Sequence, residues 1–525
     1  MLFNLLPTVR TQTGFAFCAL LAVLCLVIIS YIPNGELIGT HRLSKPSPNF
    51  VPHQITHEVT LVSPRYDSIR IGDLLHYHIH SKLTDTGGEF YQATLSSRHH
   101  PKASTAGHFV DHTNGTYSAY FYAGWSGQAT LSIVRVFTRE AVTFLKDVMW
   151  NAEDRVVWQG FFYVEGTNTS TKQSKTALCT LRSHGNWSGM CVYPHLKALG
   201  STVFLCEKLP GINCNSLYAT KSDGALIEKK MTELAIGKEK LFDKNRDYRH
   251  QIHVENSTIT ISGTFRAAAG KAKLLRCLPD EKLPPSHGYW IEDHWISLIC
   301  SITDWTSLGK LSSCLRNKNL ILLGDSTTRQ WFVLIHRLLL SPFNRGKNEK
   351  NFTWRRYHRS LNATILFTSP PQLVGSLVVF TDEVNYEVDV LDGLNDSYCN
   401  YIILISPWAH YTQWVRSNYV QRTQLLRKAL LRMRKKCPDV KIVLKGSHAR
   451  DHESFSSVLY SSDFFLKEID EINRDAFSGI GVWYLPIWAM NMAYPTENSI
   501  HMPLPVILEE LRMFFSYVCD ENSEQ

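Results

Sequence analysis

From about residue 315 onward, short apolar segments alternate with helix-length stretches. The predicted strands lie at residues 320–323, 377–380, 401–405, 441–444 and 482–485, and the predicted helices span residues 328–340, 412–436, 454–476 and 506–518. Strands that are apolar throughout are buried on both faces, so the alternation predicts βαβ units and a doubly wound parallel sheet covered by helices on both sides. Ligands of such sheets bind beyond the carboxyl ends of the strands.

One of these strand ends carries a candidate nucleophile. The apolar segment 320–323 is followed directly by Gly324, Asp325 and Ser326, and a helical pattern begins there. Glycine permits a tight turn, and a helix start offers backbone N–H groups and a positive dipole end that stabilise an oxyanion. Serine and aspartate are also preferred helix N-caps, so the motif fits a structural role as well.

His501 is the candidate base for this serine. It lies in YPTENSIHMP, between the last predicted strand and the last predicted helix. In a doubly wound sheet this loop is expected at the same carboxyl edge as Ser326, where the imidazole can accept the serine proton. A surface histidine, one of 22 in the chain, is the alternative.

An uncharged apolar segment at residues 14–32 is about as long as a membrane-spanning helix needs to be. Arg10 precedes it, which favours a type II anchor with a cytosolic N-terminus, while a cleaved signal peptide is the alternative. Ten cysteines and seven N-x-[ST] sequons lie beyond this segment. Both counts suit an oxidising compartment, so the chain is predicted to enter the secretory pathway and to contact membrane only through residues 14–32.

The rest of the chain divides into three predicted parts. Residues 33–54 are polar and contain proline, as in a stalk. Residues 55–165 show alternating segments between turn-rich sequences, which predicts a β-sandwich. Residues 166–300 hold six of the ten cysteines but no regular periodicity, so they form a cysteine-rich region without an assigned fold, ahead of the α/β domain at residues 301–525.

The strand pattern of the sandwich is clearest at residues 74–80, where Leu75, Tyr77 and Ile79 are predicted to face the core. Residues 116–136 are predicted to form two strands around a turn at residues 124–127. Three histidines occupy the outer face of the first strand, namely His76, His78 and His80. No carboxylate or cysteine completes a metal-ligand set beside them, so we interpret them as surface residues.

Two further functions are not expected. The net charge of +8 is mild for 525 residues, and no basic stripe with interleaved aromatic residues suggests nucleic-acid binding. His448 and His452 have the i, i+4 spacing of zinc ligands but lack an HExxH pattern. We therefore predict no metal site and no bound cofactor.

The sequence LGDSTTRQW, with CLRNKNL upstream and SIHMP near the C-terminus, resembles the PC-esterase group of SGNH/GDSL-type hydrolases and acyltransferases. DHTNGTY and YFYAGWSGQATLSI resemble the late strands of filamin-type immunoglobulin-like domains. A leader, an immunoglobulin-like sandwich, a cysteine-rich middle and this C-terminal domain together resemble the neurexophilin and PC-esterase domain family. REAVTFLKDV and WISLICSITDW add to that resemblance, which covers about residues 55–525.

The resemblance implies an SGNH-like fold in which Ser326 is the nucleophile and its backbone N–H is part of the oxyanion hole. Gly324 and Asp325 complete the motif, and His501 is the base. It also implies acyl-ester hydrolysis or O-acetyl transfer on glycans, with sialic acid as a plausible acceptor and acetyl-CoA as the acyl donor. The expected location is then the Golgi, as a type II membrane protein, or the secreted fraction.

The sequence departs from that pattern at the acidic member of the site. SGNH-like sites usually carry an aspartate three residues before the histidine, and here Asn498 stands there with Glu497 beside it as a substitute candidate. Members of the family carry a Trp-Asp-Met-Thr stretch, and the matching WAMNMAY has Ala489 in place of the acid. Among residues of the intermediate loop ISPWAHYTQW, His410 is the polar group best placed for the site.

These departures leave a second hypothesis open. A chain that keeps the fold without the acid is expected to be a catalytically degenerate secreted glycoprotein. Its neurexophilin-like portion resembles glycoproteins that bind neuronal receptor domains, so the chain would then act as a receptor-binding ligand.

Overall fold

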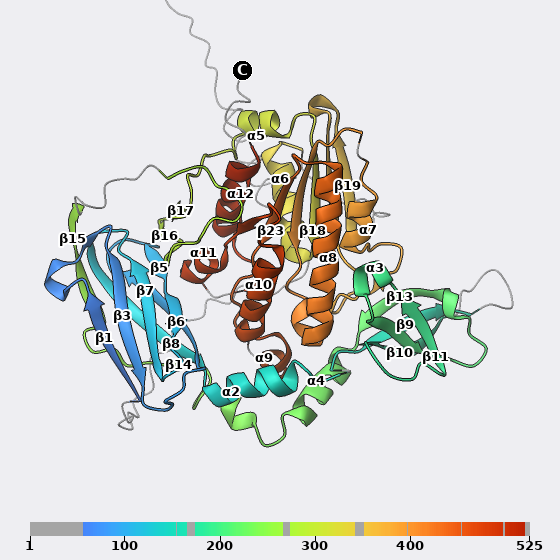
Figure 1. Ribbon diagram of the computed structural model, residues 1–525, viewed down its shortest axis with the longest axis horizontal. Helices are drawn as coiled ribbons and strands as arrows, with labels where there is room; N and C mark the ends of the chain where they lie inside the picture. The colour runs from blue at the N-terminus through green and yellow to red at the C-terminus, as the bar shows by residue number, and fades with distance from the viewer. Residues whose placement is uncertain are drawn as a thin grey trace, which may run out of the picture. The chain divides into compact units, whose positions relative to one another are not determined.

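The computed structural model describes residues 56–153, 155–164, 174–265, 274–341, 351–395, 397–452, 454–496 and 499–519 (Figure 1). The predicted anchor at 14–32, the stalk at 33–54, Glu497 and Asn498 lie outside the described residues. Within the described ranges, none of the helices has the length and apolar character needed to cross a membrane.

Two facing sheets form the N-terminal β-rich part. The first contains, in spatial order, β1 (His57–Ser63), β3 (Leu74–Ser81), β7 (Thr116–Tyr122) and β6 (His108–Asp111). The second contains β17 (His294–Ser297), β16 (Gly288–Ile291), β5 (Ser104–Ala106), β4 (Phe90–Ser97), β8 (Gly127–Phe137), β15 (Thr258–Phe265) and β2 (Arg70–Ile71), with β14 (His250–Gln251) paired to β8. The inner faces of both sheets share one apolar core, so the arrangement is a β-sandwich.

The alternation in β3 is confirmed, because Leu75, Tyr77 and Ile79 are each 0% exposed. On the outer face, His76 is 2.9 Å from the Ser118 hydroxyl through Nε2. Across the described part of the chain, no three His, Cys, Asp or Glu side chains are grouped to hold a metal ion. The two strands predicted within residues 116–136 are β7 and β8, and they belong to opposite sheets, so the turn between them connects the two sheets instead of closing a hairpin.

A third β-sheet follows in the cysteine-rich region. It contains β11 (Met190–Pro194), β12 (Val203–Glu207), β10 (Ser174–Arg182), β9 (Trp158–Tyr163), β13 (Leu217–Ser222) and β21 (Val379–Phe380). The predicted strand at residues 377–380 was therefore assigned to the wrong sheet, since β21 pairs antiparallel with β13. A short apolar segment indicates a strand but carries no information about its pairing partner.

Strand pairing crosses both predicted domain boundaries. The boundary at residue 300 is crossed by β21, which lies beyond it and pairs with β13. β9 lies before residue 166 and pairs with β10 and β13, which lie beyond it. β15 and β16, from the region predicted as cysteine-rich, join the sandwich through β8 and β5. The boundaries at residues 165 and 300 remain predictions.

The C-terminal α/β domain is built on a sheet in the order β19 (Thr353–His358), β20 (Ala363–Thr368), β18 (Asn319–Gly324), β22 (Tyr401–Ser406), β23 (Lys441–Lys445) and β24 (Trp483–Leu485). All neighbours pair in parallel except the edge strand β19. β20, which the apolar pattern did not indicate, takes the place expected for residues 377–380. Numbered along the chain, the five parallel strands have the order 2-1-3-4-5 of a doubly wound sheet, with its switch point between β18 and β22.

Helices surround this sheet. They are α5 (Leu308–Leu315), α6 (Ser326–Leu338), α7 (Glu387–Asp392), α8 (Arg416–Lys436), α9 (Phe455–Ser461), α10 (Asp463–Phe477), α11 (Trp488–Ala493) and α12 (Leu504–Val518), and three more lie in the preceding parts: α2 (Arg139–Thr143), α3 (Leu196–Leu199) and α4 (Gly224–Leu234). The chain moves from β18 to β20 in one direction and from β22 to β23 in the other, so right-handed crossovers put α6 and α8 on opposite faces (Figure 1). The helix predicted at 454–476 is divided at Ser462, whose backbone is extended.

The ten cysteines beyond residue 32 pair with one another. The disulfides are Cys179–Cys206, Cys191–Cys214, Cys277–Cys300, Cys314–Cys519 and Cys399–Cys437. Cys314–Cys519 closes the α/β domain by joining the end of α5 to the end of α12, over 205 residues of sequence. Five disulfides accord with the predicted oxidising compartment.

Arg155 joins the middle of the chain to the α/β domain. Its side chain is 1% exposed, and its guanidinium donates to the carbonyl oxygens of Met149 at 2.7 Å, Gln413 at 3.0 Å and Trp414 at 2.9 Å. A further bond reaches the carbonyl of Thr412. One side chain therefore satisfies four carbonyl groups, three of them in the segment that follows β22.

Replacing Arg155 with methionine is expected to lower the free energy of unfolding by about 3 kcal/mol or more, because the buried carbonyls lose their donor. Denaturant unfolding of the disulfide-bonded protein measures this change. Arg246→Met, at an exposed arginine, is the control and should change the free energy by less than about 0.5 kcal/mol. Equal effects of the two substitutions would contradict the role given to Arg155.

Candidate active site

In the strand-to-helix turn after β18, one residue caps the helix and the next carries the candidate nucleophile. Asp325 is the N-cap of α6, and its Oδ1 accepts hydrogen bonds from the Thr327 backbone N–H at 2.8 Å and the Thr327 hydroxyl at 2.7 Å. Ser326 is the first helical residue, and its half-buried side chain takes no part in the cap. The cap role that the sequence left open for Ser326 therefore belongs to Asp325.

Gly324 allows this turn to pack tightly. A Cβ atom at this position would lie 2.4 Å from the Thr328 hydroxyl oxygen and 2.9 Å from the Cβ of Ser406 on β22. Both distances are shorter than van der Waals contact permits, so any larger residue displaces α6 or β22. The glycine thus sets the position of Ser326 at the switch point of the sheet.

His501 meets Ser326 at this edge. Its Nε2 is 2.8 Å from the Ser326 hydroxyl oxygen, although the two residues are 175 positions apart. The backbone N–H of His501 donates to the Ser499 hydroxyl at 3.3 Å, which helps to hold the loop before α12. The imidazole is exposed, so a substrate can reach the pair from solvent. A serine and an imidazole at this distance can exchange a proton.

The surroundings of His501 favour its neutral form. Burial of part of the ring lowers its pKa below the usual value of 6.5, and the positive charges of Arg329, Arg450 and Lys445 lower it further. The negative charge of Asp325 acts in the opposite direction. A neutral imidazole is the form that accepts a proton from serine.

The pH dependence of kcat/KM tests whether the pKa of His501 is lowered in this way. If His501 is the base, kcat/KM should hold its plateau to below pH 6.5 and fall only when the imidazole is protonated. Arg329→Gln removes a positive charge, so the pKa of His501 and the acid limb should both move to higher pH. An acid limb above pH 6.5 in the unaltered protein would contradict the prediction.

The described residues provide no carboxylate hydrogen-bonded to His501. Ala489 lies on α11 and lines a separate pocket whose lining contains neither Ser326 nor His501. Glu497, the candidate acid of the sequence, lies outside the described residues. Asp325 is the carboxylate whose charge acts on the imidazole. It is 3% exposed, and its Oδ2 accepts no hydrogen bond from the described part of the protein.

His410 lies beside the same carboxylate. Its Nδ1 accepts a hydrogen bond from the Val374 backbone N–H at 3.3 Å, which assigns the proton of the neutral ring to Nε2. Burial lowers the pKa of His410, while the charge of Asp325 opposes that shift. A neutral imidazole with an Nε2–H group is a suitable donor to an oxyanion.

A buried polar network behind the turn was not predicted from the sequence. Lys445 Nζ, at the end of β23, is 3.3 Å from Glu510 Oε2 and 3.4 Å from the Thr327 hydroxyl oxygen. Trp331 Nε1 donates to Glu510 Oε2 at 2.9 Å, and Asn491 Nδ2 donates to Glu510 Oε1 at 3.1 Å. Lys445 and Glu510 are 2% and 1% exposed. The network connects the first turn of α6 to β23, α11 and α12.

The sequence held a signal for this network. Lys445 follows an apolar strand directly, and Glu510 lies on the largely apolar helix α12. Charged residues at positions expected to be buried are usually paired. Pairing them with each other required knowledge of the tertiary structure.

His448 and His452, the histidines with i, i+4 spacing, have different surroundings in the structure. His448 is 1% exposed and packs edge-on against Trp408, with 4.7 Å between ring centroids. Its pKa lies well below 6.5, first because of burial and then because of Lys445. His452 Nε2 is 2.5 Å from the carbonyl oxygen of Ser461. Each histidine is therefore accommodated in a packed interior.

The structure thus brings a serine and a histidine together at the carboxyl edge of a doubly wound α/β sheet. Residues 295–519 match the family model described as NXPE family member 4-like, C-terminal domain. Residues 63–239 match the neurexophilin family model. The chain belongs to the neurexophilin and PC-esterase domain family. No solved structure matches it.

Both matches and the five disulfides indicate a protein of the secretory pathway. The described sequons fit this location. Asn114, Asn186, Asn256, Asn362 and Asn395 are exposed, whereas Asn351 is half-buried.

Proposed function

We propose that the protein is an acyltransferase or esterase of the secretory pathway that moves an acetyl group onto or off a hydroxyl of a glycan. The observation that carries this proposal is the 2.8 Å distance between His501 Nε2 and the Ser326 hydroxyl oxygen at an exposed sheet edge. The order of the parallel strands supports an SGNH-like fold for the domain, and the two-sheet core supports an immunoglobulin-like sandwich ahead of it.

The transfer divides into two steps. His501 takes the hydroxyl proton of Ser326, and the serine oxygen attacks the thioester carbonyl of acetyl-CoA. The carbon–sulfur bond breaks, and the thiol leaves with the proton from His501. In the second step His501 takes the proton of a glycan hydroxyl, whose oxygen attacks acetyl-Ser326. The serine then recovers its proton from His501. For hydrolysis, the first step acts on the ester of an acetylated glycan, whose hydroxyl leaves with the proton from His501, and water is the acceptor in the second step.

The chain offers two donors for the oxyanion of each step. The backbone N–H of Ser326 belongs to the first turn of α6, where the N–H groups have no partner within the helix. The Nε2–H of neutral His410 is the second candidate. Asp325 would stabilise the imidazolium that forms on His501, the role that an acidic triad member fills in related sites.

The test uses the soluble chain from about residue 40 onward, with acetyl-CoA as donor and sialylated glycans as acceptors. A gain of one acetyl group by mass spectrometry supports transfer, and sialic acid is the acceptor we expect. Loss of acetyl from acetylated glycans supports hydrolysis instead. If folded, glycosylated protein does neither, the enzymatic proposal is wrong.

A receptor-binding glycoprotein is the second candidate function. It is favoured by the neurexophilin match over residues 63–239 and by the lack of a carboxylate hydrogen-bonded to His501 within the described residues. A neuronal receptor domain is the partner expected in that case. Ser326→Ala then leaves partner binding intact, whereas substitutions on exposed strands of the sandwich abolish it.

A further inference from the structure

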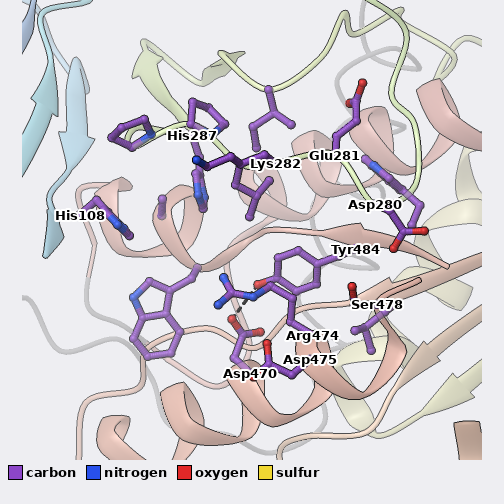
Figure 2. A pocket seen from close by; sticks show the side chains of 18 of the residues that line it. His108, Asp280, Glu281, Lys282, His287, Asp470, Arg474, Asp475, Ser478 and Tyr484 are labelled. Carbon is purple, nitrogen blue, oxygen red and sulfur yellow. Dashed lines mark hydrogen bonds between the residues drawn. The ribbon is translucent and has the colours of Figure 1, made fainter. Parts of the chain in front are cut away.

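Two pockets of the described structure differ in the charge of their linings. One has a volume of about 620 Å³, and His108, His287 and Arg474 are among the residues that line it (Figure 2). Burial lowers the pKa of both histidines and so favours their neutral forms. Its carboxylates are Asp280, Glu281, Asp470 and Asp475, and its cations are Lys282, Lys467 and Arg474. The charges of this pocket therefore nearly cancel.

The second pocket is a groove of about 530 Å³ along α8, which we call the α8 groove. Four cationic side chains line it against a single carboxylate. The residues of the candidate active site do not line it. The cations are Lys428, Arg432 and Lys436 of α8 and Lys197 of α3, and the carboxylate is Asp392 at the end of α7.

Three of these cations form a row along α8. Lys428, Arg432 and Lys436 are exposed and follow one another at intervals of four residues, so they lie on one face of the helix. The row is about 12 Å long, because a helix rises about 1.5 Å per residue. Like charges at this spacing destabilise a helix, and a bound anion removes that cost.

The dipole of α8 explains only part of this charge. Cations are favourable in the last turn of a helix, which accounts for Lys436. Lys428 lies more than two turns before the end of α8, and Lys197 belongs to a different segment. The grouping of cations therefore needs a further explanation.

Contacts of α3 with α7 and α8 place Lys197 beside the row. His195, the N-cap of α3, is 2.8 Å from the Asp389 carboxylate on α7 through Nε2. The Gln421 side chain of α8 accepts from the Ser201 backbone N–H at 3.0 Å. A Cβ atom at Gly200 would lie 2.6 Å from that side chain, so the approach is close. The groove is thus a built feature of the fold.

The carboxylate of the groove is already engaged by its cations. Arg432 donates from Nε to Asp392 Oδ1 and from Nη2 to Oδ2, each at 2.9 Å. Lys197 Nζ is 3.6 Å from Oδ2, and Lys436 Nζ donates to the Asp392 carbonyl at 2.8 Å. The hydrogen bond and charge of Arg432, followed by the charges of Lys197 and Lys436, lower the pKa of Asp392.

Positive charge remains after this pairing. Lys428 forms no ion pair or hydrogen bond with the described residues. Asp389, the next carboxylate along α7, is the partner of His195. Counting Asp389 together with Asp392 still leaves four cations against two carboxylates. The α8 groove therefore carries a net positive charge.

The shape of this charge suits an extended polyanion. A single phosphate or sulfate ion reaches one or two of the cations, whereas a chain follows the whole row. Six of the ten residues at 427–436 are lysine or arginine, a density typical of heparin-binding and nucleic-acid-binding segments. Sulfated glycans, and not nucleic acids, are the polyanions that a protein of the secretory pathway meets. A groove also admits a chain, while lipid headgroups present a flat surface.

We propose that the α8 groove binds a sulfated glycosaminoglycan chain, whose sulfate groups are held by Lys197 and by the row on α8. Sulfate oxygens accept charge-assisted hydrogen bonds from ammonium and guanidinium groups. Binding should weaken steeply as the salt concentration rises, because a polyanion releases condensed counterions when it binds. The proposal is independent of the chemistry at Ser326.

The test measures binding of an immobilised heparin octasaccharide to the full-length, glycosylated protein in a neutral detergent. Glycosylated protein is required because the sequon at Asn395 lies three residues beyond Asp392. The comparison probes are the same octasaccharide after chemical desulfation, polyglutamate, and vesicles that contain phosphatidylserine.

At about 0.15 M salt, we expect saturable binding of the octasaccharide that is about tenfold or more tighter than that of each comparison probe. This binding should decrease steadily at higher salt. Absence of saturable binding overturns the proposal. Equal or tighter binding of the desulfated chain, polyglutamate or the vesicles also overturns it.

Substitutions locate the site. Lys428→Gln/Lys436→Gln removes two charges of the row and should weaken octasaccharide binding about tenfold or more. Lys197→Gln should weaken it about threefold or more, because the chain also contacts α3.

Lys240→Gln/Lys244→Gln is the matched control. It removes the same two charges from exposed positions outside the groove and should leave binding within about twofold of the unaltered protein. Melting curves of both double variants show whether each retains the fold. If two folded double variants bind the octasaccharide equally, the assignment to the α8 groove is wrong.

Discussion

Ser326→Ala should reduce acyl transfer or hydrolysis by about 10³-fold or more while leaving Tm within about 1–2 °C of the unaltered protein. The rate falls because the hydroxyl that faces His501 Nε2 at 2.8 Å is the proposed nucleophile. Stability is retained because Asp325, and not Ser326, caps α6. Steady-state rates and a melting curve on the same sample measure both quantities.

Ser417→Ala is the matched control. Ser417 is an exposed serine in the first turn of α8, another helix of the same domain, so its loss should change neither rate nor Tm. If Ser326→Ala keeps the activity of the unaltered protein, Ser326 is not the nucleophile. If its Tm falls by several degrees, the assignment of the cap to Asp325 alone is wrong.

The ion pair behind the nucleophile turn should produce the second large effect. Glu510→Gln leaves the Lys445 ammonium buried without a countercharge, and Lys445→Met leaves the Glu510 carboxylate in the same condition. Each single substitution is expected to lower the free energy of unfolding by about 3–5 kcal/mol. Denaturant unfolding with the disulfides intact measures the loss.

The double variant Lys445→Met/Glu510→Gln tests whether each loss of stability comes from the charge that is left unpaired. Glutamine retains an oxygen that accepts from Trp331 or Asn491, and no buried charge remains. The double variant should therefore be more stable than either single variant, with a coupling energy of about 1–3 kcal/mol. Additive losses would show that the two charges act independently.

This pair also bears on activity. Lys445 contacts the Thr327 hydroxyl, and Thr327 donates twice to Asp325. The network therefore holds the first turn of α6 in place. Lys445 is a positioning residue because it acts through Thr327 and not on the substrate. A stable double variant should consequently lower kcat more than it raises KM.

Local pattern predicted much of the α/β domain. The segments at 320–323, 401–405, 441–444 and 482–485 lie within or overlap β18, β22, β23 and β24. These strands are apolar because helices cover both faces of the sheet. A continuous run of apolar residues therefore indicates such a strand from the sequence alone. The failures were of two kinds. β20 alternates and was missed, and residues 377–380 form a strand whose partner lies in another sheet.

The sequence by itself determined the secondary structure of the buried strands, the oxidising environment of ten cysteines and the chemical types of the site residues. These properties depend on neighbours in sequence or on side-chain chemistry. Only the tertiary structure decided that Ser326 faces His501 across 175 residues, that Lys445 pairs with Glu510, and that His108, His287 and Arg474 share a pocket. Such contacts arise when sheet order and helix packing bring distant segments together, and periodicity reports which residues are buried but not which of them meet.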